Sequence, residues 1–384
     1  MKPQDTVIAN IIADSLVGRV EQSETRHAIQ TVQKCDTLNR RQFLNRLGTI
    51  SGVALSALPA FAQIGGGRVL TPPTETAALP PVVEVIGKQV WEEDRLNEDA
   101  VGEMVDRAMM KLTGRDTAKE AWRDFVLPDD IVGIKINPLA GPKLSTHAVI
   151  VNKIIEGLFS AGVLRKQVII WDRFEAHLLN AGYPIKTDDG DVRTLASDMD
   201  DIGYDDEVFY ETEQDSIARR ENESTRSRYS RIVTERVDVL INVPVLKHHD
   251  MAGISGCLKN MAFGSVDNTR RFHGRPLYCN PAIGEIFENK VLKEKVVLNI
   301  VDGLVASYDN GPTYHAESTW QYGGLFVSAD PVILDTLILQ TVNQKREEIG
   351  LNSMSKYANH ITAASGLGLG SNSLDQVNLQ KIEV

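Results

Sequence analysis

Residues 131–171 read IVGIKINPLAGPKLSTHAVIVNKIIEGLFSAGVLRKQVIIW, and this stretch decides the fold. Its two ends, residues 131–136 and 168–171, are short continuous apolar runs, which is the pattern of strands buried on both faces. Between them, apolar residues at helical spacing predict a helix over 146–160, with Thr146 as its expected cap. A helix that joins two neighbouring strands is a crossover, so the two strands are predicted to be parallel.

The same pattern continues on both sides of this stretch. Residues 237–243 and 296–301 are two further apolar runs, and both predict strands of the same sheet. Asn97 is expected to cap one helix, and Asp330 followed by Pro331 is expected to begin another. The predicted fold class is therefore α/β, with a mostly parallel sheet and helices on both of its faces.

The chain divides into a leader, a linker and one domain. Residues 63–81 are rich in glycine and proline and predict a linker, and residues 82–384 form the α/β domain. Within that domain, residues 186–230 are acidic, then mixed in charge and poor in apolar residues. We expect this segment to be an irregular polar insertion at the surface.

Polar residues follow each predicted strand at its carboxyl end, where open parallel sheets bind their ligands. They are Lys135 and Asn137 after the first strand, Asp172 and Arg173 after the second, Lys247, His248, His249 and Asp250 after the third, and Asp302 after the fourth. We expect these side chains to gather at one edge of the sheet and to form a functional site there.

The richest segment is residues 242–264, NVPVLKHHDMAGISGCLKNMAFG, in which Lys259 and Asn260 follow a polar loop with two glycines. The ammonium groups of Lys135, Lys247 and Lys259 are suited to bind a phosphate or a carboxylate. Lys135, Asn137, Lys259 and Asn260 are accordingly predicted to bind a small anionic ligand.

The adjacent residues His248 and His249 point to opposite sides of an extended segment, so only one of them is expected to face the site. Geometry gives a slight preference to His248. Together with His273 and Asp302, His248 could also hold a divalent metal ion. Both histidines remain candidates at this point.

The segment 242–264 resembles the core motif of the bacterial and archaeal family of unknown function DUF362, roughly INVPVLKTH…G.S..LKN..G. Residues 128–137, PDDIVGIKIN, are similar to the opening motif of that family, and the resemblance covers about residues 120–380. The Lys-Thr-His of the family corresponds to Lys247, His248 and His249 here, so the resemblance points to His249. Some relatives carry a ferredoxin-like insertion with four cysteines. This chain has three cysteines in all, and it is predicted to hold no iron–sulfur cluster of its own.

The first 62 residues match an export signal. Residues 39–44, NRRQFL, fit the twin-arginine pattern, a run of small and apolar residues follows at 48–59, and residues 60–62, AFA, form a cleavage site. The run is too short for a permanent membrane span. The chain is therefore expected to be carried to the periplasm by the twin-arginine translocase and to be cleaved after Ala62.

Charge and cysteine content limit the remaining possibilities. The formal net charge is −11, which argues against nucleic acid or an anionic membrane surface as a partner. Cys257 and Cys279 lie in the exported domain, and they could form a disulfide or remain buried thiols.

Two functions fit these observations. The first is an exported enzyme that acts on a small anionic substrate, with or without a divalent metal, and uses His249, Lys247 and Asp172 as its catalytic residues. The alternative is a periplasmic protein that binds a ligand or cofactor in the same pocket without catalysis. A purely structural role is disfavoured, because structural proteins seldom place charges at the ends of buried strands.

Overall fold

The computed structural model describes residues 79–93, 95–217 and 223–384. The predicted export signal at 1–62 lies outside the described residues, as does most of the predicted linker. Pro81, the last residue of that linker, is already the first residue of strand β1.

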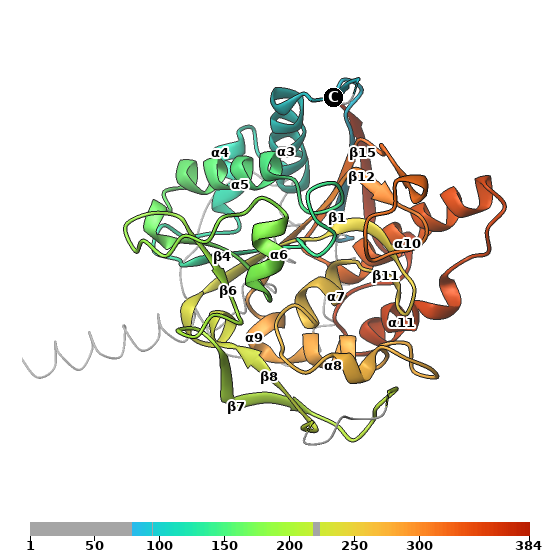
Figure 1. The fold of residues 1–384 in the computed structure, drawn as a ribbon. Helices are drawn as coiled ribbons and strands as arrows, with labels where there is room; N and C mark the ends of the chain where they lie inside the picture. Colours follow the sequence, from blue (N-terminus) through green and yellow to red (C-terminus); the bar gives the residue numbers. More distant parts are fainter. Residues whose placement is uncertain (1–78, 94, 218–222) are drawn as a thin grey trace, which may run out of the picture. The chain divides into compact units, whose positions relative to one another are not determined.

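One mixed sheet of 11 strands runs through the described part of the chain (Figure 1). Its main order is β15 (Asn378–Glu383), β1 (Pro81–Ile86), β14 (Gly324–Ser328), β12 (Val296–Ser307), β9 (Val239–Val243), β4 (Val132–Ile136), β5 (Val168–Asp172) and β6 (Arg193–Ala196). The strands from β12 to β6 are parallel, and β14 runs antiparallel to both of its neighbours. The predicted α/β class is confirmed, and the four predicted strands are consecutive neighbours.

Helices cover both faces of this sheet (Figure 1). One face carries α3 (Glu98–Thr113), α4 (Ala118–Arg123) and α5 (Ala148–Ala161), and the other carries α7 (Cys257–Ala262), α8 (Ala282–Glu288), α10 (Pro331–Glu348) and α11 (Asn359–Gly366). Successive residues of each strand point alternately toward the two helix layers. In β1, for example, Val82 packs into one hydrophobic core and Val83 into the other.

The described chain also has several smaller elements. They include the helices α6 (Glu175–Asn180) and α9 (Lys290–Lys293), the paired strands β2 (Trp91–Glu92) and β3 (Arg95–Leu96), and the short strands β11 (Gly253–Ile254) and β13 (Thr319–Trp320). Within the described residues, no helix combines the length and the apolar character needed to cross a membrane.

Two of the three predicted helix caps are confirmed. The Asn97 side chain accepts a hydrogen bond from Ala100 N at the start of α3, and that of Asp330 accepts from Val332 N and Ile333 N at the start of α10. The prediction for Thr146 is wrong, because α5 begins one residue later, after His147. The Thr146 hydroxyl instead donates to Val243 O and accepts from Asn137 N, so it joins the ends of β9 and β4.

The prediction that residues 186–230 are irregular is also wrong in part. Strand β6 adds to the edge of the main sheet, and β7 (Tyr204–Glu211) pairs with β8 (Arg226–Ser230) in a separate hairpin. Backbone pairing stabilises these strands, and no residue of β7 is fully buried. A search for continuous apolar runs misses such strands, since their sequence is largely polar.

The course of the chain after β9 creates the space for a site. Strand β4 ends at Ile136, whereas the chain leaves β9 at Pro244 and continues alongside β12 as β10 (Val245–His249). Strand β10 therefore extends past the carboxyl end of β4. The loops that follow β4 and β5, together with α7, face β10 across this step.

Candidate functional site

A cavity of about 390 Å³ lies at the carboxyl ends of β4, β5 and β10. Polar and charged side chains from four separate stretches line it. They are Lys135, Asn137, Asp172, Arg173, His177, His249, Asp250, Ser255, Lys259, Asn260, Thr269 and His273. The structure thus brings together six of the seven predicted catalytic and substrate-binding residues. The seventh, Lys247, contacts the lining residue Asn137.

We call the buried part of the cavity wall formed by Lys135, Asn137, Asp172 and Asn260 the cavity floor. Lys135 and Asp172 form a buried ion pair in it. The two residues are neighbours on β4 and β5, and Lys135 Nζ lies 2.5 Å from Asp172 Oδ1. The ammonium also donates to Ile136 O at 2.7 Å and to Asn260 Oδ1 at 3.3 Å. Burial lowers the pKa of Lys135, and the Asp172 carboxylate opposes that shift. Because its three donors are used by these groups, Lys135 links β4, β5 and α7 at the cavity floor.

Lys247 lies behind the floor and supports it. Its side chain is fully buried, and Nζ donates to Asn137 Oδ1 at 2.8 Å. Burial and the nearby charge of Lys259 lower the pKa of Lys247 to about 7. The Asn137 amide nitrogen in turn donates to Asn260 Oδ1 at 3.0 Å.

Asn260 belongs to a buried chain of amides that fixes the rest of the floor. Its Nδ2 donates to Asn242 Oδ1 at 2.8 Å, and Asn242 Nδ2 donates to Asn299 Oδ1 at 2.9 Å. Each of these amides uses both its oxygen and its nitrogen. The floor is therefore rigid, and its polar groups are satisfied by one another.

Lys259, on α7, differs from the other two lysines. Its side chain is partly buried and lines the cavity, and within the described residues it has no hydrogen bond and no carboxylate partner. Its Nζ lies 5.2 Å from the centre of the Phe263 ring, a weak cation–π contact. Burial lowers the pKa of Lys259, which is the expected effect on a cation without a counter-charge.

His249 lies at the end of β10 and faces the cavity. Its Nδ1 accepts hydrogen bonds from Met251 N at 3.1 Å and Ala252 N at 3.2 Å. Burial and the charge of Lys259 lower the pKa of His249 well below its usual range. His249 is therefore a neutral imidazole with its proton on Nε2.

His273 lies beside it, and the two ring centres are 5.6 Å apart. Its Nδ1 lies 3.0 Å from Thr269 O, a carbonyl oxygen that can only accept. Burial and Lys259 lower the pKa of His273 to about 3. His273 is thus also neutral, but it carries its proton on Nδ1.

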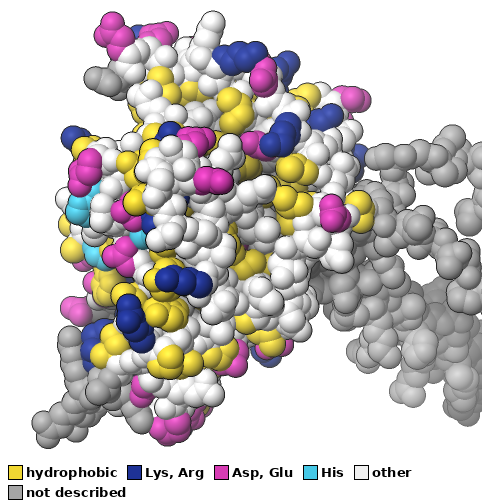
Figure 2. Space-filling view, turned by 90° about the vertical axis from the view of Figure 1, so that its right-hand side faces the viewer, with side chains coloured by type: hydrophobic (Ala, Val, Ile, Leu, Met, Phe, Trp, Pro, Cys, Tyr) yellow, Lys and Arg dark blue, Asp and Glu magenta, His cyan; other side chains and the backbone are white. Residues whose placement is uncertain are grey.

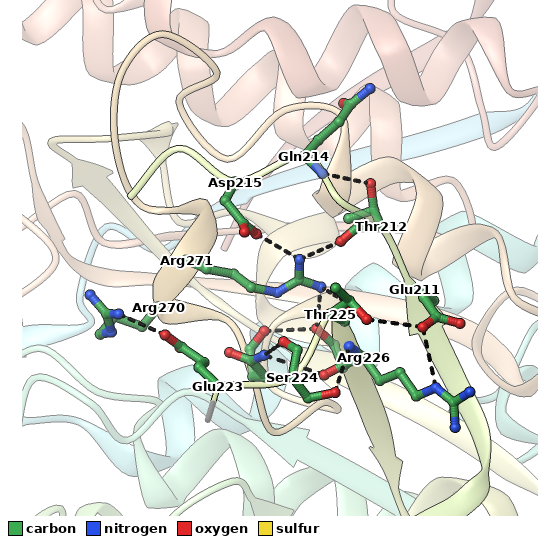
Figure 3. A network of polar contacts seen from close by, with 12 residues as sticks. Glu211, Thr212, Gln214, Asp215, Glu223, Ser224, Thr225, Arg226, Arg270 and Arg271 are labelled. Atoms are coloured by element: carbon green, nitrogen blue, oxygen red, sulfur yellow. Dashed lines mark hydrogen bonds and ion pairs between the residues drawn. The ribbon is translucent and has the colours of Figure 1, made fainter. Parts of the chain in front are cut away.

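A network around Arg271 fixes the segment that carries His273. The fully buried Arg271 guanidinium donates to Thr212 O and Asp215 Oδ1 at 2.8 Å and to Thr225 O at 2.6 Å (Figure 3). These partners lie in the connection of the β7–β8 hairpin, two of them after β7 and one directly before β8. The hairpin therefore holds the short helical turn Arg270–Phe272 in place directly before His273.

The three predicted metal ligands do not come together. His248 points away from the cavity, with Nδ1 accepting from Gly311 N at 3.0 Å, while Asp302 accepts from His147 Nδ1 at 2.8 Å. Only His273 lines the cavity. In the described parts of the chain, no three His, Cys, Asp or Glu side chains form a group that could hold a metal ion. The geometric preference for His248 is thus wrong, because the bend after β9 turns the alternate face of β10 toward the site.

Cys257 and Cys279 are both buried free thiols. Of the two alternatives predicted for this pair, a disulfide and buried thiols, the structure therefore has the thiols.

Figure 2 shows acidic and basic side chains interspersed on one face of the molecule, with no broad area of a single charge there. On that face, attraction of an anion depends on individual groups.

Arg173, which the sequence also places at the end of the second predicted strand, lines the cavity and donates to Thr269 Oγ1 at 2.7 Å and to Asp267 O. Among the lining residues that were not predicted are His177, on α6, and Phe263, which supplies an apolar wall four residues after Lys259. Their positions, on the helix after β5 and directly after α7, were the available signal.

Comparison with known proteins identifies a family for this chain. A family model described as "Domain of unknown function (DUF362)" matches residues 132–340. The chain is also similar to a crystal structure of a protein from Thermotoga maritima, with 10% identity and a TM-score of 0.36. The alignment covers 72% of this chain and 60% of that one. No curated protein matches the chain.

Proposed function

Because this chain belongs to the DUF362 family, whose description names no activity, we propose its function from the chemistry of the cavity. We propose that it is an enzyme acting on a small anionic substrate, which Lys259 binds. One observation carries this proposal. Lys259 lines a 390 Å³ cavity, and it has no counter-charge and no hydrogen-bond partner within the described residues.

An anion would correct the electrostatic imbalance around Lys259. A partly buried ammonium group without a partner is unfavourable, and a bound anion stabilises its charged form. His249 supports the same role, because its Nε2–H is a hydrogen-bond donor in the same cavity. Binding of the anion should therefore raise the lowered pKa of Lys259.

Catalysis in this proposal is a proton transfer. His249 orients the substrate as a donor, since its Nδ1 is occupied by two backbone N–H groups. The proton acceptor is His273 Nε2, whose basicity increases when an anion binds beside it. Lys247 and Asp172 act on the substrate indirectly, through Asn137 and Lys135.

Binding is tested by titration of the purified domain with inorganic phosphate and with short carboxylates in a calorimeter. Lys259→Met should weaken binding at least about tenfold, the effect of removing one charge-assisted hydrogen bond. The matched control is Lys119→Met, because Lys119 is exposed on α4. Equal binding by the Lys259 variant and the control would reject the proposal.

Catalysis is tested with the anions that bind. In deuterated buffer, NMR should detect conversion of a bound ligand or deuterium exchange into it. His273→Gln should abolish that reaction and preserve binding. The alternative, a non-catalytic periplasmic binding protein, predicts unchanged ligands for the wild type and for the variant alike.

Export and metal dependence belong to the same proposal. We propose that the twin-arginine translocase delivers the folded domain to the periplasm, on the basis of residues 39–62. Within the described residues His273 is the one cavity histidine suited to a divalent metal, because Nδ1–H bonded to a carbonyl is typical of metal-ligating histidines. A metal bound at its Nε2 would take the place of the proton-acceptor role, and it would need further ligands from the substrate or from water. Elemental analysis of the exported protein tests this point.

A further inference from the structure

The two cavity histidines differ in which ring nitrogen carries the proton. His249 Nδ1 accepts from two backbone N–H groups, Met251 N and Ala252 N, and a protonated Nδ1 would face both of them with a hydrogen. The proton of the neutral ring is therefore on Nε2. His249 offers the cavity a donor.

His273 has the opposite arrangement. Thr269 O is a carbonyl oxygen 3.0 Å from Nδ1, and a carbonyl cannot donate a hydrogen bond. The proton is on Nδ1, and Nε2 keeps its lone pair. His273 offers the cavity an acceptor.

These two groups lie next to each other. The ring centres are 5.6 Å apart, both rings line the cavity, and within the described residues neither Nε2 has a hydrogen-bond partner. A single hydroxyl group can satisfy both, because its oxygen accepts from His249 while its hydrogen is donated to His273. A bare carboxylate or sulfate oxygen can satisfy only His249, and it faces a lone pair at His273.

We infer that the cavity selects a small anion that carries its own hydroxyl group, held between His249 and His273 with its charge at Lys259. This inference rests on the proposed anion site and specifies its ligand class. Hydrogen phosphate and short hydroxycarboxylates share the required chemistry. Phe263 and Met251 in the wall can contact the carbon atoms of a hydroxycarboxylate.

Two pairs of equally charged probes test the inference at pH 8 by calorimetry. Hydrogen phosphate has a hydroxyl group and sulfate has none, and glycolate has a hydroxyl group that acetate lacks. We expect the wild type to bind the hydroxylated member of one pair or both at least about tenfold more tightly, because the other member leaves His273 unpaired. A preference within the first pair alone indicates a phosphate ligand, and within the second alone a hydroxycarboxylate.

Variants assign the preference to the histidines. His273→Phe should abolish the preference and keep the affinity for acetate and sulfate within about threefold, because the charge contact at Lys259 remains. His273→Gln, whose side-chain oxygen can accept, should restore part of it. His249→Phe should weaken both members of a pair. Thermal unfolding of each variant verifies that it is folded.

These measurements test the hydroxyl selection and the anion site at Lys259 separately. If the wild type binds both members of each pair equally while Lys259→Met abolishes binding, the hydroxyl selection is wrong and the anion site stands. A preference that survives in His273→Phe also overturns the inference. If no probe binds in a manner that depends on Lys259, both are wrong.

Discussion

Gly264 touches two members of the cavity floor, and a side chain at this position would displace them. A Cβ atom there would lie well inside van der Waals contact of Asn260 O and of Lys135 Cε. The backbone oxygen cannot move away cheaply, so Lys135 would have to leave its place beside Asp172. Gly264→Ala should lower the free energy of unfolding by about 1–3 kcal/mol and weaken anion binding.

The control for this change is Gly366→Ala. No atom lies within 4 Å of the added methyl group at Gly366, which is exposed. Urea denaturation should place this variant within about 0.5 kcal/mol of the wild type. Equal stability of the two variants would show that the floor tolerates displacement of Lys135.

Lys247 should make stability depend on pH. Its pKa is about 7 in the folded protein and near its model-compound value of 10.5 in the unfolded chain, so the unfolded chain binds more protons between these values. The cost of burying its charge is complete below pH 7 and disappears as the pH rises toward 10.5. Its contribution to the free energy of unfolding should thus increase by up to about 1.4 kcal/mol per pH unit in that window.

Lys247→Met removes this contribution. Urea denaturation at pH 7.5 and 9 should show a smaller rise in stability for the variant than for the wild type. The comparison with the wild type is needed because burial also lowers the pKa of Lys135 and Lys259. Equal slopes in the two proteins would mean that Lys247 is not a buried titrating group.

At the residue scale, the sequence predicted that Lys135, Asp172 and Lys259 meet, but it also grouped His248 and Asp302 with the site residue His273, and it did not predict the role of each side chain. Parallel strands end at one edge, so Lys135 and Asp172 had to be close. Whether His248 or His249 faced the cavity depended on the bend after β9, which follows from pairing with β12. The proton positions on His249 and His273 depend on backbone groups that no residue pattern specifies.

Helices α4 and α5 pack through a glycine. A Cβ at Gly157 on α5 would overlap the indole of Trp122 on α4, and both residues belong to the core on that face of the sheet. Gly157→Ala should therefore separate the two helices and lower the free energy of unfolding by about 1–3 kcal/mol. Urea denaturation measures this difference.

Gly102 on α3 is the matched comparison, because a Cβ there would make only an ordinary contact with Lys153 Cδ at 3.7 Å. Gly102→Ala should raise the free energy of unfolding by about 0.5–1 kcal/mol, since alanine favours the helix over glycine. A loss of stability in Gly102→Ala would show that α3 needs its glycine for packing.

Among the elements, those with continuous apolar runs or clear caps were predicted correctly. Strands β4, β5, β9 and β12 and helices α3 and α10 are of this kind. Strands β6, β7 and β8 were missed because their stability comes from backbone pairing with partners distant in the sequence. The start of α5 was misplaced because the Thr146 hydroxyl has a tertiary partner, Val243 O, that outweighs local capping.

For the whole molecule, the export prediction concerns residues outside the described part of the chain. Replacing Arg40 and Arg41 with lysine should stop export and leave full-length precursor in the cytoplasm, because the translocase recognises the arginine pair. Cell fractionation measures this. Mass spectrometry of the exported wild type should find Gln63 at its N-terminus, and normal export of the double variant would refute the twin-arginine assignment.

Strand β1 lies between β14 and β15, so Val83 pairs with Val327 and Val82 with Leu379. Synthesis on the ribosome produces β1 early, β14 late and β15 last. Until then the backbone N–H and C=O groups of β1 have no strand to pair with, and this edge of the sheet is complete only after the final residues emerge. We therefore expect nascent chains to stay bound to chaperones until synthesis is complete, and the sheet to reach its final form only after the chain leaves the ribosome.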